Sequence, residues 1–163
     1  MGVPLEMRYL LLLGLLLTSF AHAGGEPEFQ IEQLQRQAIA GDAYAQLNLG
    51  AAFDNGFGVR RDHEQAFYWY RAAAEQGVAE AQFNLGHLYA SGLGVPQSYR
   101  TAAEWLERAA EQGVVDAAYL LGVIHRDGLG VEPDFGVAHR WFSQAARGGQ
   151  SDAVRALQAL KVK

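Results

Sequence analysis

Residues 49–59 read LGAAFDNGFGV, residues 85–95 read LGHLYASGLGV and residues 121–131 read LGVIHRDGLGV, so one motif recurs every 36 residues. Positions outside the motif keep the same spacing, including Trp69, Trp105 and Trp141. Self-similarity at a fixed period of this length is typical of stacked-repeat architectures. Such stacks form extended binding surfaces. The pattern therefore favours a binding protein over an enzyme.

Each 36-residue unit is predicted to be a helix–turn–helix hairpin. In the middle unit, apolar residues follow helical spacing at 81, 85, 88 and 89, and again at 102, 105, 106 and 109. Gly92 and Gly94 allow the left-handed backbone that ends the first helix. Ser98 is placed to cap the second helix, as Asp62 and Asp134 are in the other units. Short links make neighbouring helices antiparallel.

A glycine falls inside each first helix, at Gly50, Gly86 and Gly122. Glycine in a helix interior costs about 1 kcal/mol relative to alanine, so its recurrence indicates a packing role: the second helix approaches closely there. The large tryptophan rings are predicted to fill the space that small residues open.

The pattern A-Q-x-x-L-G-x-x-[FY]-x-x-G-x-G-V, then A-x-x-W, then A-A-x-x-G, resembles the Sel1-like repeat, a relative of the tetratricopeptide repeat. The chain departs from it at Ala118, in place of glutamine, and at His125, in place of an aromatic residue. The resemblance implies an all-α, right-handed α-solenoid of three repeats at about 38–73, 74–109 and 110–145. A lone second helix over 28–40 and a C-terminal cap over 146–163 are predicted to close the ends.

Residues 1–23 have the pattern of a secretory signal peptide. Arg8 precedes the apolar run YLLLLGLLL at 9–17, and Ala21-His22-Ala23 is a cleavage site. We expect cleavage after Ala23, a single mature domain over 24–163, and a periplasmic or secreted location. An uncleaved anchor is the weaker alternative, because about 18 apolar residues are needed to span a bilayer; a start at Met7 stays open.

Composition excludes several classes of protein and partner. The chain has no cysteine, which excludes a lipid-anchored lipoprotein, a disulfide framework and thiolate chemistry. Its net charge is −5 and no Lys/Arg stripe is visible, so nucleic acid is not expected as a partner. No apolar run after the leader could cross a membrane.

No motif supports catalysis, a cofactor or a metal. Gly56-Phe57-Gly58 begins a G-x-G-x-x-G motif, but Arg61 stands where its last glycine should be. His63-Glu64 begins an H-E-x-x-H motif that Phe67 ends, and the other histidines have no paired spacing. We expect no cofactor and no catalytic residue.

One surface is a candidate binding site: the stripe of each first helix that points away from the core. Resemblance to tetratricopeptide stacks implies that first helices line the concave face. Most stripe residues vary between repeats whereas core residues do not, as a specific ligand requires, although drift on a solvated surface gives the same pattern. This first-helix stripe comprises Tyr44, Leu47, Ala51 and Asp54, then Glu80, Phe83, His87 and Ala90, then Asp116, Tyr119, Val123 and Arg126.

The resemblance implies a non-catalytic adaptor or regulator of the bacterial envelope that holds a protein or peptide segment. An immunity protein that neutralises a toxin and a purely structural scaffold are alternatives. Some cysteine-rich relatives are described as β-lactamases, but this chain lacks their cysteines and any Ser-x-x-Lys pair, so a hydrolase is the weakest alternative. The partner and the oligomeric state are left open.

Overall fold

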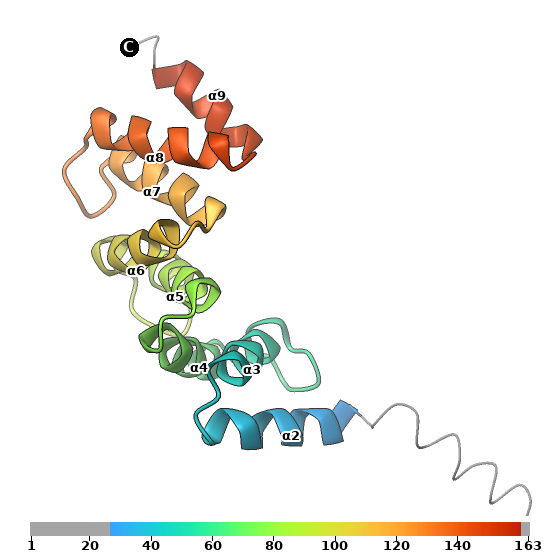
Figure 1. The fold of residues 1–163 in the computed structure, drawn as a ribbon. Coiled ribbons are helices and arrows are strands. Elements are labelled where there is room, and N and C mark those ends of the chain that lie inside the picture. Colours follow the sequence, from blue (N-terminus) through green and yellow to red (C-terminus); the bar gives the residue numbers. More distant parts are fainter. Residues whose placement is uncertain (1–26, 161–163) are drawn as a thin grey trace, which may run out of the picture.

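The computed structural model describes residues 27–160, and these form eight α-helices and no strand. The helices follow one another along an elongated stack, with α2 at one end and α9 at the other (Figure 1). Their bounds are α2 Pro27–Ile39, α3 Ala43–Asn55, α4 His63–Glu75, α5 Ala79–Ser91, α6 Tyr99–Glu111, α7 Val115–Asp127, α8 Phe135–Arg147 and α9 Ser151–Leu160. The predicted all-α solenoid is confirmed.

Three antiparallel pairs, α3–α4, α5–α6 and α7–α8, form the repeats, and the main contacts join helices that are neighbours in the chain. The predicted caps are present: Asp62 Oδ1 accepts hydrogen bonds from the backbone N–H groups of Glu64 and Gln65, and Ser98 and Asp134 cap α6 and α8 in the same way. Left-handed glycines end the first helix of each pair. Local sequence therefore sets the bounds of the helices.

The glycines inside the first helices are contact points, as predicted. A Cβ atom added to Gly86 would lie 2.8 Å from Leu106 Cγ. At Gly50 it would lie 2.6 Å from the ring of Tyr70, and at Gly122 it would lie 2.5 Å from the ring of Phe142.

The tryptophan rings, which are predicted to pack against the small alanines, do not fill the space beside these glycines. The side chain against each glycine belongs to the residue after the tryptophan, and the tryptophans themselves are only half-buried. Each tryptophan comes one residue earlier in the helix, so its side chain points to a different side. There, at the edge of the core, it packs against one of the core clusters. The space beside a glycine is thus filled by a tyrosine, a leucine or a phenylalanine.

The two end helices carry polar residues where the repeats pack most closely. Gln158 of α9 occupies the position of the packing glycines, and Gln37 of α2 occupies the position of Ala73, which is completely buried. Both glutamines are exposed. α2 and α9 therefore end the described stack with side chains that would hinder further close packing.

Candidate functional site

The first-helix stripe lies on α3, α5 and α7, and none of its twelve residues is buried. Tyr44 is 67% exposed, and Glu80, His87 and Asp116 are also exposed. The remaining eight are half-buried. The stripe is therefore available to a ligand over all three repeats, and its role in binding stays a prediction.

The half-buried aromatic and leucine residues of the stripe also pack against neighbouring helices, within a repeat or between repeats. Leu47 packs against the core cluster that includes residues of α4 and α5, and Phe83 packs against the cluster of α6 to α9. Tyr119 reaches Phe142, with ring centroids 5.7 Å apart. These three residues thus contribute to packing between helices, whatever else they do.

Two charged stripe residues are held by neighbours. The guanidinium of Arg126 donates two hydrogen bonds of 2.7 Å to the carboxylate of Asp127, which raises the pKa of Arg126. Asp116 accepts a hydrogen bond of 2.8 Å from Gln150 Nε2. Both side chains are therefore oriented before any ligand arrives, which lowers the entropy cost of binding.

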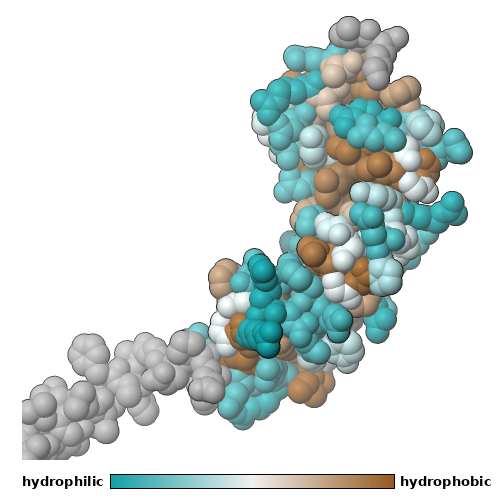
Figure 2. Space-filling model, turned by 180° about the vertical axis from the view of Figure 1, so that it is seen from behind, coloured by the Kyte–Doolittle hydropathy of each residue, from teal (hydrophilic) through white to brown (hydrophobic). Residues whose placement is uncertain are grey.

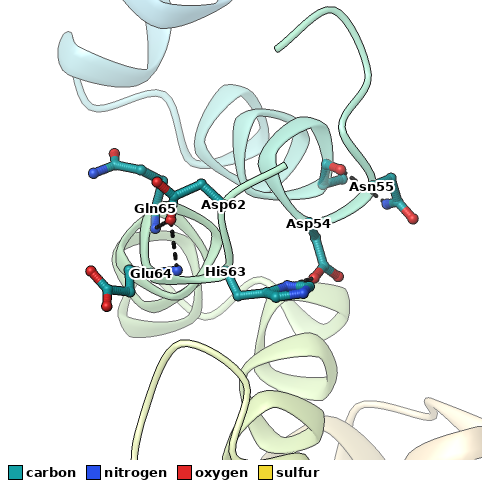
Figure 3. A network of polar contacts seen from close by, with 7 residues as sticks. Asp54, Asn55, Asp62, His63, Glu64 and Gln65 are labelled. Carbon is teal, nitrogen blue, oxygen red and sulfur yellow. Dashed lines mark hydrogen bonds and ion pairs between the residues drawn. The ribbon is translucent and has the colours of Figure 1, made fainter. Parts of the chain in front are cut away.

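A polar network that the sequence did not reveal joins α3 to α4 in the first repeat (Figure 3). His63 Nδ1 lies 2.9 Å from Asp54 Oδ1. Burial raises the pKa of the Tyr70 phenol well above its usual range, and the neighbouring Asp54 carboxylate raises it further. The network fastens the two helices together.

The network is specific to the first repeat. The residues 36 positions after Asp54 and His63 are Ala90 and Tyr99, which cannot form this pair. Recurrence at the repeat period therefore offered no signal for it. The nine-residue separation of Asp54 and His63 becomes a contact only because the turn at 56–62 reverses the chain.

A cavity beside this network has a volume of about 640 Å³. Its lining consists of Phe53, Arg60, Arg61, Asp62, His63, Glu64 and Gly94. Charges of both signs meet there, and the Asp62 carboxylate already caps α4. Its described lining contains no serine, threonine, cysteine or lysine that His63 could activate. Among residues 27–160 no cluster of His, Cys, Asp and Glu has the arrangement of a metal site.

A second feature missed in the sequence is a ladder of glutamines in which a buried glutamine is paired with an exposed one. Gln82 Nε2 donates to the carbonyl of Ala74, and Gln82 Oε1 accepts from Gln112 Nε2 at 2.8 Å. Gln46 and Gln76 repeat this arrangement one repeat earlier.

In the third repeat, the equivalent backbone carbonyl is that of Ala110, and it accepts from a different side chain. Ala118 and Gly148 replace both glutamines, and Gln144 Nε2 donates to the carbonyl of Ala110 instead. The paired recurrence of the glutamines at the 36-residue period is the signal that could have revealed the ladder.

Surface hydropathy shows no single dominant apolar patch on the side drawn in Figure 2, where several separate apolar patches lie among hydrophilic ones. None of the helices within residues 27–160 has the length and apolar character needed to cross a bilayer.

Solved structures similar to this chain are repeat proteins. A Sel1 repeat protein from Oxalobacter formigenes is 37% identical, with a TM-score of 0.71, over 80% of this chain and 98% of that one. A protective antigen of uropathogenic Escherichia coli that displays an SLR fold is 41% identical, with a TM-score of 0.72, over 76% of this chain but only 26% of that one. Cysteine-rich protein B of Helicobacter pylori, at 21% identity and a TM-score of 0.65, over 83% of this chain and all of that one, shares the fold.

Comparison with curated proteins gives no significant match. Three consecutive Sel1 repeats are matched at residues 43–78, 79–114 and 115–150, about two thirds of the chain. Repeats of this kind generally mediate protein–protein interaction, and their fold is typically a non-catalytic scaffold. The chain belongs to the Sel1 repeat family.

Proposed function

We propose that this protein is a non-catalytic adaptor or regulator of the bacterial cell envelope that binds a partner protein through the first-helix stripe. One observation carries the proposal: the packing of the repeats is nearly constant while the unburied stripe residues change. Gly50, Gly86 and Gly122 face their second helices in the same way. By contrast, the stripe presents Tyr44, then Glu80, then Asp116 at one and the same repeat position.

The stripe offers both anchors and orienting charges. The partly exposed rings of Phe83 and Tyr119 could hold an apolar side chain of a partner. Aromatic residues are enriched among those that dominate interface energies. The carboxylates of Glu80 and Asp116 and the guanidinium of Arg126, which is held by Asp127, add polar groups to the same stripe. This arrangement suits an extended or helical peptide segment.

The envelope location is proposed from the leader at 1–23, which lies outside the described residues. An exported adaptor without cysteines must rely on its packed core for stability, and the buried residues of the three repeats supply such a core.

The test begins with crosslinking and affinity purification from the envelope fraction to identify the partner. Binding is then measured with Tyr44→Ala, Glu80→Arg and His87→Ala, whose side chains are exposed and can change without disturbing the core. If these positions include hot spots, the triple variant should lose about 2 kcal/mol or more of binding free energy, with helicity retained.

A matched control changes the same residue types on second helices: Tyr68→Ala, Glu104→Arg and His139→Ala, which are also exposed. Binding should change little, as is usual for exposed positions outside an interface. If the control set alone weakens the complex, the partner binds the second helices and the first-helix stripe is not the site.

A further inference from the structure

The half-buried tryptophans of the second helices have three different surroundings. Trp69 lies edge-on to Tyr68, with ring centroids 4.9 Å apart. Trp105 carries the guanidinium of Arg108, whose Cζ lies 4.5 Å from the ring centroid. Within residues 27–160 neither a cation nor a second ring lies over Trp141. In the described part of the chain, the third indole is therefore the one whose face carries neither a ring nor a cation.

The residue at position 144 explains why no guanidinium of this chain lies over Trp141. Gln144 stands 36 residues after Arg108, and its side-chain amide donates a hydrogen bond of 2.7 Å to the carbonyl of Ala110. That bond takes over the role of the glutamine ladder, so the side chain is committed to the backbone. A cavity of about 320 Å³ remains, lined by Glu107, Arg140, Trp141 and Gln144.

The contact between Arg108 and Trp105 shows that an indole at this repeat position can bind a guanidinium group. A guanidinium over the face of a tryptophan is attracted by the ring quadrupole, and tryptophan is the best aromatic partner for it. The cavity at Trp141 adds the carboxylate of Glu107, which forms no ion pair in the described part of the chain. A planar cation with hydrogen-bond donors can stack on the indole and donate to that carboxylate.

We propose that the cavity between α6 and α8 binds the guanidinium group of an arginine side chain presented by another molecule. The indole of Trp141 and the carboxylate of Glu107 are the recognising groups. Arg140 also lines the cavity, and its positive charge opposes a bare cation, so the site favours a ligand with an acceptor, such as a peptide carbonyl, beside the guanidinium. The site lies on the second helices and does not depend on the first-helix stripe.

The probe is N-acetyl-arginine methylamide, titrated into ¹⁵N-labelled protein while the three indole N–H resonances are followed by NMR. Single Trp→Phe variants assign the resonances. We expect a saturable shift of the Trp141 signal and no comparable shift of Trp105 or Trp69. N-acetyl-norleucine methylamide, which lacks the guanidinium, should leave all three signals in place.

Exchanging residues between equivalent positions of the second and third repeats makes the test more specific. Gln144→Arg supplies an internal guanidinium, as Arg108 does for Trp105, and should abolish the Trp141 response. Arg108→Gln uncovers Trp105 beside Glu104 and should create a second responding indole. Glu107→Gln should weaken binding roughly threefold, the size typical of an exposed ion pair, and Arg140→Gln should strengthen it.

The proposal is overturned if no indole responds to the arginine probe, or if Trp105 responds as strongly as Trp141 in the unmodified protein. It is equally overturned if the Trp141 response survives in a folded Gln144→Arg variant. Each readout is independent of any partner protein, so failure here leaves the proposed function to be judged on its own experiment.

Discussion

At the scale of single residues, the closest packing of each repeat depends on a missing side chain. Gly86 is completely surrounded, and an added Cβ would meet Leu106 Cγ at 2.8 Å and the carbonyl oxygen of Ala102 at 3.2 Å. The leucine has little freedom to retreat because its own side chain is fully buried. Helix propensity therefore favours replacing Gly86 by a residue with a side chain, whereas packing disfavours it.

Replacing Gly86 measures which effect is larger. Gly86→Leu should lower the free energy of unfolding by about 1–3 kcal/mol through overpacking, and Gly86→Ala should also destabilise, by less. Urea denaturation followed by circular dichroism measures both. Stabilisation by alanine with no loss for leucine would contradict the packing role, because it is the result that helix propensity alone predicts.

Tyr70 makes the free energy of unfolding depend on pH in the alkaline range. Its folded-state pKa is raised, first by burial and then by Asp54, so the unfolded chain loses the phenolic proton at a lower pH than the folded protein. The stabilisation is complete below about pH 10, the ordinary tyrosine value, and is lost as the pH rises above it.

Chemical denaturation at a series of pH values from about 8 upward tests this for Tyr70. Tyr70→Phe removes the titrating group and should flatten the alkaline decline in the free energy of unfolding. An alkaline decline that is equally steep in the variant would show that other groups cause it.

At the scale of helices, contacts between repeats are both apolar and polar. Gln82 is 5% exposed, and its amide satisfies the carbonyl of Ala74 at the end of α4. The third repeat shows that an alanine is tolerated at this position when a glutamine on the neighbouring helix replaces the donor. The requirement concerns the carbonyl, not the residue that reaches it.

The arrangement of the third repeat can be introduced into the second repeat by mutation. Gln82→Ala should cost about 0.5–1.5 kcal/mol, because it removes one buried hydrogen bond to the carbonyl of Ala74, which still accepts from the backbone N–H of Gly77. Adding Arg108→Gln places a donor where Gln144 stands in the third repeat, and should recover part of the loss in thermal unfolding. A double variant no more stable than Gln82→Ala would show that the carbonyl does not limit stability.

At the scale of the whole molecule, an elongated stack without cysteines gains its stability from contacts between neighbouring helices (Figure 1). Nearest-neighbour contacts of this kind make stability approximately a sum of terms within and between adjacent repeats. We therefore expect a chain that begins at Gly24 to keep all of the described helices.

We expect the mature protein to begin at Gly24. Mass spectrometry of the protein recovered from the periplasm or medium of the producing cell measures its first residue. An intact N-terminus on protein found only in the cytosol would reject export, and would remove the basis for an envelope role.

The sequence alone determined the class of fold, the number of repeats and the ends of most helices, because these follow from local rules. The 36-residue period specifies the stack, and the caps at Asp62, Ser98 and Asp134 and the turn glycines act within a few residues of where they stand. The first-helix stripe also follows from helical spacing, and none of its residues is buried, but spacing identifies no partner and the role of the stripe in binding stays a prediction.

Only the tertiary structure decided which side chain fills the space beside each glycine. Trp105 and Leu106 are adjacent in the chain but point in different directions from the helix, and the angle at which α6 meets α5 selects the leucine. The same holds for the Asp54–His63 pair and for the uncovered Trp141. Each depends on how two helices pack, a long-range geometry that no local pattern encodes.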